Sequence, residues 1–399
     1  MKVLVFTTVF PNTTQPVHGL FVAERTRHAA ELVEISVISP VAWFQGKARA
    51  TDEFRGSHVL SVEHPRFYYI PGLFKFLDGL WLFLSALPAG KRLQKRFDFD
   101  LIDAHFGFPD GVAAILLGYW FKRPVTVTLR GSELDMARYR LRRLVLSWAL
   151  RRADRVIAVS SQLADLALEL GVQAERIRVI GNGVDLTRFR PLERLAARRT
   201  VGVPESVPLI VSVGHLARVK GFDLILRTVR ELLGEYPDLR FVIVGGAAAS
   251  SGAYPDELAT QIERLGLPEC VAITGVVAPD RVAFWLSAAD VFVLASEREG
   301  SPNALREALA CGCPVVASNA GDIQQIVPEH AGLIVQDRSS LSEWRRALSA
   351  ALRRRWDRQA IRSVAEQHSW SDVAGRVMAE WQTCSEAGAA DVRARASVR

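Results

Sequence analysis

The sequence VFVLASEREGSPNALREALACGCPVVAS, Val291 to Ser318, contains the pattern that decides the fold. VFVLAS and PVVAS are short apolar runs of the kind that a buried parallel strand gives, and they flank a loop and a helix. Ser301 and Pro302 predict the start of the helix, because the hydroxyl can accept from an unpaired amide and proline at the first helical position loses no hydrogen bond. Gly312 and Pro314 predict its end. The stretch therefore predicts a strand, helix and strand of a parallel sheet.

The start of this helix combines an anion site with two carboxylates. Its first amides, near Asn303 and Ala304, are unpaired donors at the positive end of the helix dipole, so they favour a phosphate or a polarised sugar oxygen. Glu307 lies four residues beyond Asn303 on the same face, and Glu299 precedes the helix in the loop. A carboxylate beside an anion is costly unless it binds hydroxyls, as an acidic residue does with a ribose diol. The combination favours a nucleotide sugar; the alternative is two solvated glutamates in an ordinary α/β unit.

The segment from Glu299 to Glu307, EGSPNALRE, followed by ACGCPVVAS, resembles the Glu-x7-Glu signature of the retaining glycosyltransferases of family 4, which have the GT-B fold. In that family the first glutamate contacts the transferred sugar and the second holds the nucleotide ribose. The resemblance assigns these roles to Glu299 and Glu307. It also implies that the donor is bound by Gly300, Ser301, Pro302, Asn303 and Ala304.

Size and composition limit the class of protein. The 399 residues are enough for two domains with a core each, and a hydrophobic content of 49% excludes a disordered chain. The four cysteines are too few for a disulfide scaffold, and Cys311-Gly-Cys313 has no second pair for a zinc site. We therefore expect reduced cysteines in a cytoplasmic protein. The N-terminal MKVLVFTTVF lacks a small-residue cleavage site, so it predicts a first strand rather than a secretory signal.

The net charge of +7 is concentrated in the first half of the chain, where residues 1–195 carry 27 Lys and Arg against 19 Asp and Glu. Arg66 to Leu87 is the most apolar stretch, but Pro71 and Asp78 interrupt it, so we expect no membrane-spanning helix. Leu134 to Arg155 carries seven arginines among apolar residues, which is typical of a basic amphipathic helix on an anionic membrane. The alternative is a core-packed helix with a solvated arginine face. A charged acceptor or a nucleic acid would also explain the basic excess, and we expect no nucleic acid.

Strand-like runs alternate with helical patterns through both halves, which predicts two doubly wound parallel sheets. The predicted strands are 2–10, 34–40, 100–105, 125–130, 155–160 and 177–181, then 209–214, 239–245, 271–276, 291–296, 314–318 and 332–336. The fold class is therefore α/β, and the resemblance implies a GT-B fold with two Rossmann-like domains that face each other across a cleft.

The domain boundaries follow from the same pattern. We expect an acceptor-binding domain over 1–190 and a nucleotide-sugar-binding domain over 205–368, linked by the polar, proline-bearing stretch 185–208. HSWSDVAGRVMAEW, from His368, matches the last helix of GT-B proteins, which returns to the first domain. We therefore expect a helix over about 369–384 that packs on the first domain, and a flexible tail over 385–399.

VSVGHLARVKGFD, from Val211, is a second motif with chemical content. After a predicted strand it places Arg218 and Lys220 in a loop before a helix, where two cations can neutralise a departing diphosphate. Basic loop residues are usually only solvated, but the glycine frame of this loop is similar to the family's diphosphate clamp. The resemblance makes Lys220 and Arg218 catalytic together with Glu299. It also puts His215, where the family often has arginine, in contact with the donor.

The first half carries further candidates at its predicted strand ends. Gly19 closes the loop PNTTQPVHG, and the resemblance makes it a contact of the donor diphosphate, whereas the alternative is a connecting loop. His105 ends a strand and is either structural or functional. Arg130 stands where family members commonly carry a histidine that contacts the transferred sugar. Arginine can bind a carboxylate or phosphate in bidentate fashion, so an acidic sugar or a phosphorylated acceptor is a hypothesis. Asn182-Gly183 predicts a structural turn.

Together these features predict a retaining glycosyltransferase of the hexosyltransferase class. The resemblance implies a UDP- or GDP-linked sugar as the donor, and a glycan or polyprenyl-linked acceptor with Arg130 and His105 as contacts of the acceptor or sugar. Retention without a clear protein nucleophile implies same-face attack, with the donor's β-phosphate taking the acceptor proton. We expect no cofactor and no metal: Asp98-Phe-Asp100 resembles an Asp-x-Asp metal motif, but DFDLIDAH reads as the polar start of a strand.

The functions that are common in the resembled family, together with the basic and apolar surface, predict a role in exopolysaccharide or cell-envelope glycan biosynthesis. We expect the protein in the cytoplasm or peripherally on the inner face of the cytoplasmic membrane. Two alternatives stay open. A GT-B sugar-nucleotide epimerase would bind the same donor but would need its own acid and base residues. A non-enzymatic polyanion-binding protein would explain the basic first half, but it would leave the glutamate pair without a role.

Overall fold

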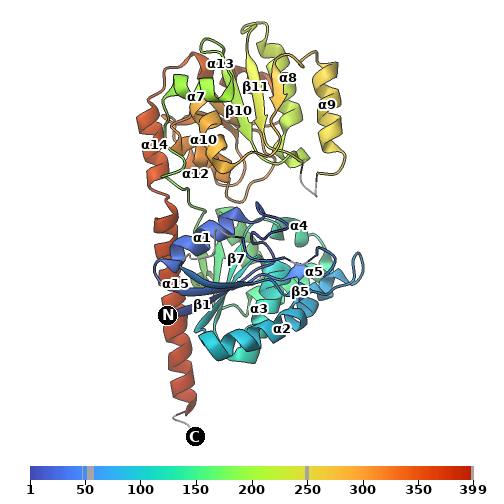
Figure 1. The fold of residues 1–399 in the computed structure, drawn as a ribbon, viewed down its shortest axis with the longest axis vertical. Coiled ribbons are helices and arrows are strands. Elements are labelled where there is room, and N and C mark those ends of the chain that lie inside the picture. The colour runs from blue at the N-terminus through green and yellow to red at the C-terminus, as the bar shows by residue number, and fades with distance from the viewer. Residues whose placement is uncertain (47, 52–57, 248–250, 397–399) are drawn as a thin grey trace. The chain divides into compact units, whose positions relative to one another are not determined.

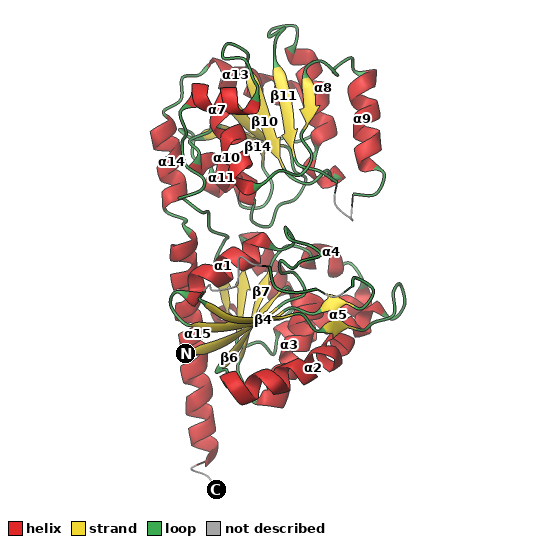
Figure 2. Ribbon diagram, viewed as in Figure 1, coloured by secondary structure: helices red, strands yellow, loops and turns green. Residues whose placement is uncertain are grey.

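A computed structural model describes residues 1–46, 48–51, 58–247 and 251–396, with side chains described through Glu386. The chain divides into two compact units. The first contains Met1–Asn182 together with the C-terminal segment from Trp370, and the second contains Gly183–Ser369 (Figure 1). Helices and parallel strands alternate in both units (Figure 2). The predicted α/β fold class with two parallel sheets is therefore confirmed.

The sheet of the first unit has the strand order β4-β2-β1-β6-β7-β8-β9, and every pairing is parallel. Its strands are β1 (Lys2–Phe6), β2 (Glu34–Ile38), β4 (Val59–Glu63), β6 (Leu101–His105), β7 (Val125–Leu129), β8 (Arg155–Ala158) and β9 (Ile177–Val179). A separate two-stranded ribbon pairs β3 (Val41–Ala42) with β5 (Arg66–Phe67). The α-helices of the first unit are α1 (Leu20–Ala30), α2 (Asp78–Phe97), α3 (Val112–Phe121), α4 (Glu133–Met136), α5 (Arg140–Leu150), α6 (Ser161–Glu169) and α15 (Trp370–Ala396).

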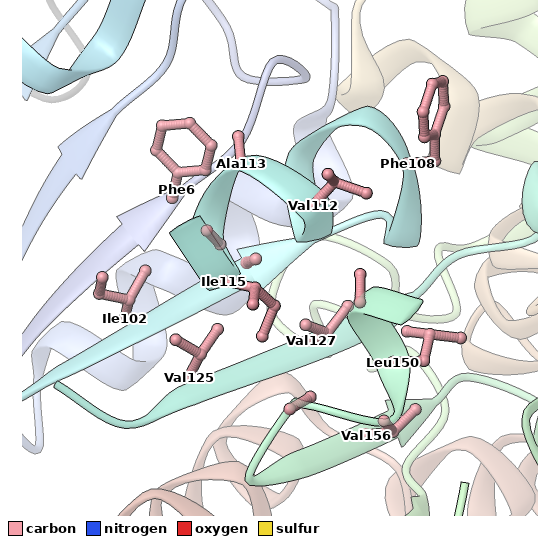
Figure 3. Close-up of a cluster of buried hydrophobic side chains, with 14 of the residues drawn as sticks. Phe6, Ile102, Phe108, Val112, Ala113, Ile115, Val125, Val127, Leu150 and Val156 are labelled. Atoms are coloured by element: carbon pink, nitrogen blue, oxygen red, sulfur yellow. The ribbon is translucent and has the colours of Figure 1, made fainter. Parts of the chain in front are cut away.

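Alternation along the strands divides the core of the first unit into two layers, because successive side chains of a strand point to opposite faces. Leu4 and Phe6 of β1 pack with residues of α2, α3, α5 and α6, whereas Val3 and Val5 pack with α1 and α15. Part of the first layer is seen in Figure 3, where Phe6, Ile102, Val125 and Val127 surround the start of α3. Both faces of the sheet are therefore covered, which explains why its strands read as continuous apolar runs.

The sheet of the second unit has the order β12-β11-β10-β13-β14-β15 and is also parallel. Its strands are β10 (Leu209–Val213), β11 (Arg240–Val244), β12 (Val271–Ile273), β13 (Val291–Leu294), β14 (Val315–Ser318) and β15 (Gly332–Val335). The helices are α7 (Arg194–Val201), α8 (Phe222–Leu232), α9 (Tyr254–Arg264), α10 (Pro279–Ala288), α11 (Asn303–Ala310), α12 (Ile323–Ile326), α13 (Leu341–Arg353) and α14 (Arg358–Glu366). One face packs with α7, α10, α11 and α14, and the other with α8, α9 and α13.

Some predicted elements differ from the structure. The stretch 134–155 predicted one helix, but α4 ends at Met136, α5 begins at Arg140, and Arg155 already opens β8. The segment 185–208, expected to be a linker, contains α7 and lies in the second unit. Helix α15 continues through Ala396, so most of the stretch predicted as a tail is helical, whereas 397–399 lie outside the described residues. The short strands β3, β4 and β5 were not predicted.

Candidate functional site

The second sheet has a topological switch point beside β10, which pairs with β11 on one side and with β13 on the other. In open α/β sheets ligands bind outside the carboxyl ends of the strands at such a point. The loops that leave β10 and β13, residues 214–221 and 295–302, both lie there. They are hydrogen-bonded to each other, since the Glu297 amide donates to the Val219 carbonyl at 2.8 Å. The two motifs singled out in the sequence therefore meet.

Lys220 and Glu299 form an ion pair at this point. The Lys220 Nζ donates to Glu299 Oε1 at 2.7 Å, and the Ser296 hydroxyl donates to the same oxygen at 2.5 Å. Glu299 is nearly buried, with 9% of its side chain exposed, whereas Lys220 is 26% exposed. A half-exposed ammonium group held by a buried carboxylate is oriented before any ligand binds, so little side-chain entropy remains to be lost on binding.

Two glycines set the path of the loop that carries Lys220. Gly221 has φ +69°, and a Cβ there would lie 2.3 Å from the Ala295 carbonyl oxygen. Only glycine allows the loop to pass this close to the end of β13. A Cβ on Gly214 would lie 3.7 Å from Cε of Lys220, so the lysine stem passes over this residue. The glycine frame recognised in the sequence thus brings Lys220 against Glu299.

Helix α11 begins one residue later than predicted. Asn303 is its first residue and Pro302 occupies the N-cap position, which leaves Ser301 outside the helix. Proline has no side-chain oxygen to cap the amides of the first turn, so this position adds no cap to the helix start. Gly300 and Ala304 are half-buried on either side of this start. The helix ends as predicted, with Cys311 as C-cap and Gly312 at φ +67°.

Glu307 lies in the first turns of α11 and is half-buried. Burial raises the pKa of its carboxyl group to about 7, against a smaller opposing effect of the Arg188 charge. A carboxyl group in this condition can accept hydrogen bonds from ligand hydroxyls.

Arg218 and His215 do not join the ion pair. Arg218 lies on the same 3₁₀ turn as Lys220, but it is exposed, forms an ion pair with Glu257 of α9 and stacks over Tyr254, with 5.3 Å from Cζ to the ring centroid. His215 is exposed. The structure therefore gathers Lys220 and Glu299 and points Arg218 towards α9.

The first sheet has its own switch point, between β1 and β6. Asp103 and His105 of β6 and Arg25 of α1 form a fully buried network there, in which Asp103 accepts from Arg25, from Thr126 at 2.6 Å and from His105 at 3.1 Å. Burial alone would raise the pKa of Asp103, but the Arg25 charge and the hydrogen bonds outweigh it, so the pKa lies well below its usual range. Asp103 is therefore a carboxylate at neutral pH.

His105 connects this network to Arg130. Burial and the charges of Arg25 and Arg130 lower the pKa of His105 to about 3, so the ring is neutral. Arg130 can only donate, and its Nη2 lies 2.8 Å from His105 Nδ1, so the ring proton is on Nε2, which faces Asp103. His105 has no exposed surface. A direct contact with sugar or acceptor, as predicted from its place at a strand end, does not fit this burial, whereas a role in holding Arg130 does.

Arg130 is held by neutral partners. Its Nη1 donates to the Asn182 side chain at 2.5 Å, its Nη2 to His105, and its guanidinium carbon lies 5.3 Å from the Phe21 ring centroid. Its Nε and the Ser132 hydroxyl have no hydrogen-bond partner among the described residues. Burial and the Arg25 charge lower the pKa of Arg130, which means that the site disfavours its charge when no anion is present.

Gly19 has a structural reason for being glycine. It precedes α1 with φ +77°, and a Cβ there would lie 2.4 Å from the Val9 carbonyl oxygen. The loop after β1 therefore folds back on the start of α1. This geometry requires glycine whether or not the residue also contacts a ligand.

Several residues of these networks were missed from the sequence. Ser296, whose hydroxyl donates to Glu299, follows the apolar run of β13, and only this position after a strand could have marked it as a site residue. Arg25 lies within a helical pattern and Asp103 within a strand, where a charge is unusual and could have marked a buried pair. Glu133, which accepts from the amides of Gly107 and Gly131 at 2.7 and 2.8 Å, looked like an ordinary helix-start acid.

Within the described ranges of the chain, no cluster of three or more His, Cys, Asp and Glu side chains has the arrangement of a metal site. None of the helices described here is both long and apolar enough to cross a membrane. The four cysteines are free.

Comparison with protein families gives two adjoining matches. Residues 20–188 match the model described as Glycosyltransferase Family 4, and residues 193–368 match Glycosyl transferases group 1. A D-inositol 3-phosphate glycosyltransferase of Corynebacterium urealyticum is 31% identical over 303 residues, which are 71% of this chain and 72% of that protein. The chain spans only about half the length of several other curated relatives of that name.

Two further proteins cover most of the chain. The putative teichuronic acid biosynthesis glycosyltransferase TuaC of Bacillus subtilis is 28% identical over 355 residues, 85% of this chain and 86% of that protein. The crystal structure of Anabaena HepE with UDP-glucose has a TM-score of 0.73 and 20% identity, and the match covers 98% of this chain and all of that one. At this identity the structural likeness shows the fold alone.

Proposed function

The chain belongs to the group 1, family 4 glycosyltransferases, and on that premise we propose that it is a retaining glycosyltransferase that uses a nucleotide-diphosphate sugar. The observation that carries the proposal is the ion pair of Lys220 and Glu299 at the switch point of the second sheet. An ammonium group beside the start of α11 is suited to a diphosphate, and the two glutamates are suited to sugar and ribose hydroxyls. HepE was crystallised with UDP-glucose, which favours a UDP-linked donor here.

In this proposal the protein contributes orientation and charge stabilisation. Glu299 holds Lys220 until the donor binds, and the ammonium group then stabilises the charge that develops on the leaving diphosphate. The amides at the start of α11, from Asn303 onwards, add donors to the same charge. The acceptor oxygen bonds to the anomeric carbon on the face from which the diphosphate leaves, and the β-phosphate of the leaving group takes the acceptor proton. Because attack and departure share one face, the sugar keeps its anomeric configuration. Arg218 has a smaller role than Lys220, because its guanidinium pairs with Glu257.

The surroundings of Arg130 favour an acceptor or sugar that carries negative charge. Its direct partners are neutral, its position is fixed by Asn182, His105 and Phe21, and burial disfavours its charge. A carboxylate or phosphate would add to the Asp103 and Glu133 charges, which do not offset burial and the Arg25 charge, and could bind two guanidinium donors at once. The relatives' names mention an inositol phosphate and teichuronic acid, and both terms denote anionic compounds.

For the wider role, we propose assembly of an exopolysaccharide or another cell-envelope glycan on a polyprenyl-linked acceptor, at the inner face of the cytoplasmic membrane. Two observations support this role. The match to TuaC, whose name mentions teichuronic acid biosynthesis, spans most of the chain, and the first unit carries both the basic excess and the most apolar stretch of the sequence. Neither a metal nor another cofactor enters the proposed reaction.

Thermal shift against a panel of UDP- and GDP-linked sugars, followed by a transfer assay with the best donor, tests the proposal. Lys220→Ala is expected to lower kcat by about 30- to 1000-fold, which corresponds to a barrier increase of about 2–4 kcal/mol. Arg346→Ala, at an exposed position on α13, is the matched control and should retain activity. Wild-type turnover in Lys220→Ala, or conversion of the donor to an isomer without any acceptor, would contradict a transferase.

A further inference from the structure

The first unit carries an open hollow of about 480 Å³ that the proposed reaction does not use. It lies between residues 74–76, just before α2, and residues 138–142, where α4 is followed by α5. These segments belong to the two stretches that the sequence marked separately as apolar and as basic. The fold places them side by side, so their properties combine on one surface.

Large apolar side chains project from this surface into solvent. Phe74, Tyr139 and Leu141, which line the hollow, are 58%, 60% and 54% exposed. Leu73, which precedes Phe74, and Leu144, one helical turn after Leu141, are both 61% exposed. Single exposed apolar residues are common on soluble proteins, but a contiguous group marks a contact surface.

Aromatic rings extend the surface beyond the hollow. Lys75 lies over the Tyr69 ring at 4.2 Å, Phe44 packs edge-on against Tyr69 at 6.1 Å, and Trp43 packs edge-on against Phe44 at 5.7 Å. Trp43 and Phe44 are 44% and 54% exposed. Rings with one face packed and one edge in solvent are typical of proteins that lie at the boundary between lipid and water.

The hollow is also strongly basic. Lys75, Arg138, Arg140 and Arg142 line it. Lys75 pairs with Asp78 at 3.3 Å, and Arg138 is 3.9 Å from Asp135. Arg142 stacks on Tyr139 at 4.7 Å, and its charge also acts on Asp78, so four cations of the hollow stand against the carboxylates of Asp78 and Asp135. The surface therefore has an excess of positive charge available to an anionic partner.

We propose that this surface docks on an anionic lipid bilayer, with the apolar side chains in the acyl boundary and the arginines on lipid phosphates. Phe74, Leu141 and their neighbours supply the insertion, and Arg140 and Arg142 supply the attraction. A nucleic acid or an acidic protein would match the charge, but it would leave the protruding aliphatic residues Leu73 and Leu144 in water. The inference rests on the proposed function only in that a lipid-linked acceptor would lie in the same bilayer.

Co-sedimentation of the full chain with vesicles tests this docking. Binding is expected to vesicles of phosphatidylcholine with about one third phosphatidylglycerol, and to be much weaker with phosphatidylcholine alone. The double variant Arg140→Gln/Arg142→Gln should bind the anionic vesicles about 25-fold more weakly, which is about five-fold for each charge removed. Phe74→Ser/Leu141→Ser should also weaken binding, and unlike the arginine variant it should do so at high salt as well.

Matched controls separate the surface from general charge and hydropathy. Arg346→Gln/Arg355→Gln removes two exposed arginines from the second unit, and Tyr119→Ser removes an aromatic side chain that is 60% exposed on α3; both should bind vesicles like the wild type. Equal binding to neutral and anionic vesicles, or wild-type binding by the hollow variants, would overturn the proposal. Loss of binding in the arginine variant alone, with soluble polyphosphate competing fully, would instead indicate a polyanion partner and also overturn it.

Nucleotide-sugar binding, measured by calorimetry on the same variants, keeps the two proposals apart. The hollow variants are expected to bind the donor like the wild type, since the proposed donor residues other than Gly19 and Arg130 lie in the second unit and neither of these two lines the hollow. Vesicle binding without any nucleotide-sugar binding would contradict the proposed function and leave the docking surface intact. Donor binding without vesicle binding would do the opposite.

Discussion

Asp103→Asn is expected to lower the free energy of unfolding of the first unit by about 3–5 kcal/mol, because it removes one partner of a buried ion pair. The Asp103 side chain has no exposed surface, and its partner Arg25 is only 3% exposed. Asparagine has nearly the same volume, so the change leaves no cavity. It leaves the Arg25 guanidinium buried without a counter-charge, and it disturbs the hydrogen bonds from His105 and Thr126.

Hydrogen exchange measured at increasing urea concentrations reports the two units separately. With an m-value of about 2 kcal/mol/M, the urea midpoint of the first unit should fall by about 2 M, while the midpoint of the second should not move. Asp98→Asn is the matched control: Asp98 is 70% exposed and pairs with Arg123 at 2.7 Å, so its loss should change stability by less than about 1 kcal/mol. A loss in Asp103→Asn no larger than in this control would refute the reasoning.

The same pair predicts a pH dependence. The pKa of Asp103 in the folded chain lies below its ordinary value of 3.8. Its contribution to stability is therefore present above that value and is lost as the pH falls through the folded pKa. Wild type and Asp103→Asn should converge in stability under acid conditions, and a gap that stays constant down to acid pH would contradict the assignment.

Three further predictions concern the proposed sites. Gly221→Ala should weaken donor binding and should destabilise the second unit more than Gly202→Ala does. Both glycines have positive φ, but only at Gly221 would the added Cβ lie 2.3 Å from a backbone oxygen. Urea unfolding of the two variants compares their stabilities. Burial raises the pKa of Glu307 to about 7, so its contribution to the stability of the ligand-free protein is fully present below about pH 4.5 and is lost as the pH rises through 7. Donor affinity, measured by calorimetry, should rise between pH 4.5 and 7. Glu307→Gln should flatten this dependence of donor affinity on pH. Arg130→His should shift the transfer preference from uronic towards neutral sugars, and an unchanged preference would contradict its anionic partner.

The strands could be predicted from the sequence where both faces of the sheet are covered. β1, β10 and β13 read as continuous apolar runs because helices pack on either side of them. β4, VLSVE, lies at the edge of the first sheet and is mostly half-exposed, so it has no such run. The break between α4 and α5 was also missed. Apolar residues and arginines alternate with a helical spacing before and after residues 137–139, so the sequence pattern does not mark where α4 ends.

The meeting of Lys220 and Glu299 followed from topology, since the loops after two adjacent parallel strands reach the same edge of a sheet. The pairing of Arg218 with Glu257, rather than with the donor loops, did not follow, because the spacing of charges along a chain does not specify which of several carboxylates a long side chain reaches. The burial of His105 depends in the same way on Arg25, which comes from a distant helix. Local signals therefore located the loops but not the partners within them.

Two segments that lie far apart in the sequence complete one hydrophobic core of the first unit. Trp370, Val377 and Trp381 of α15 pack with Val3 and Val22, which are synthesised before the whole of the second unit. During synthesis the first unit must therefore wait, with one face of its sheet uncovered, until the second unit has been translated and has had time to fold. We therefore expect chains truncated before residue 370 to leave Val3, Val22 and their neighbours exposed and to aggregate more readily than the full chain.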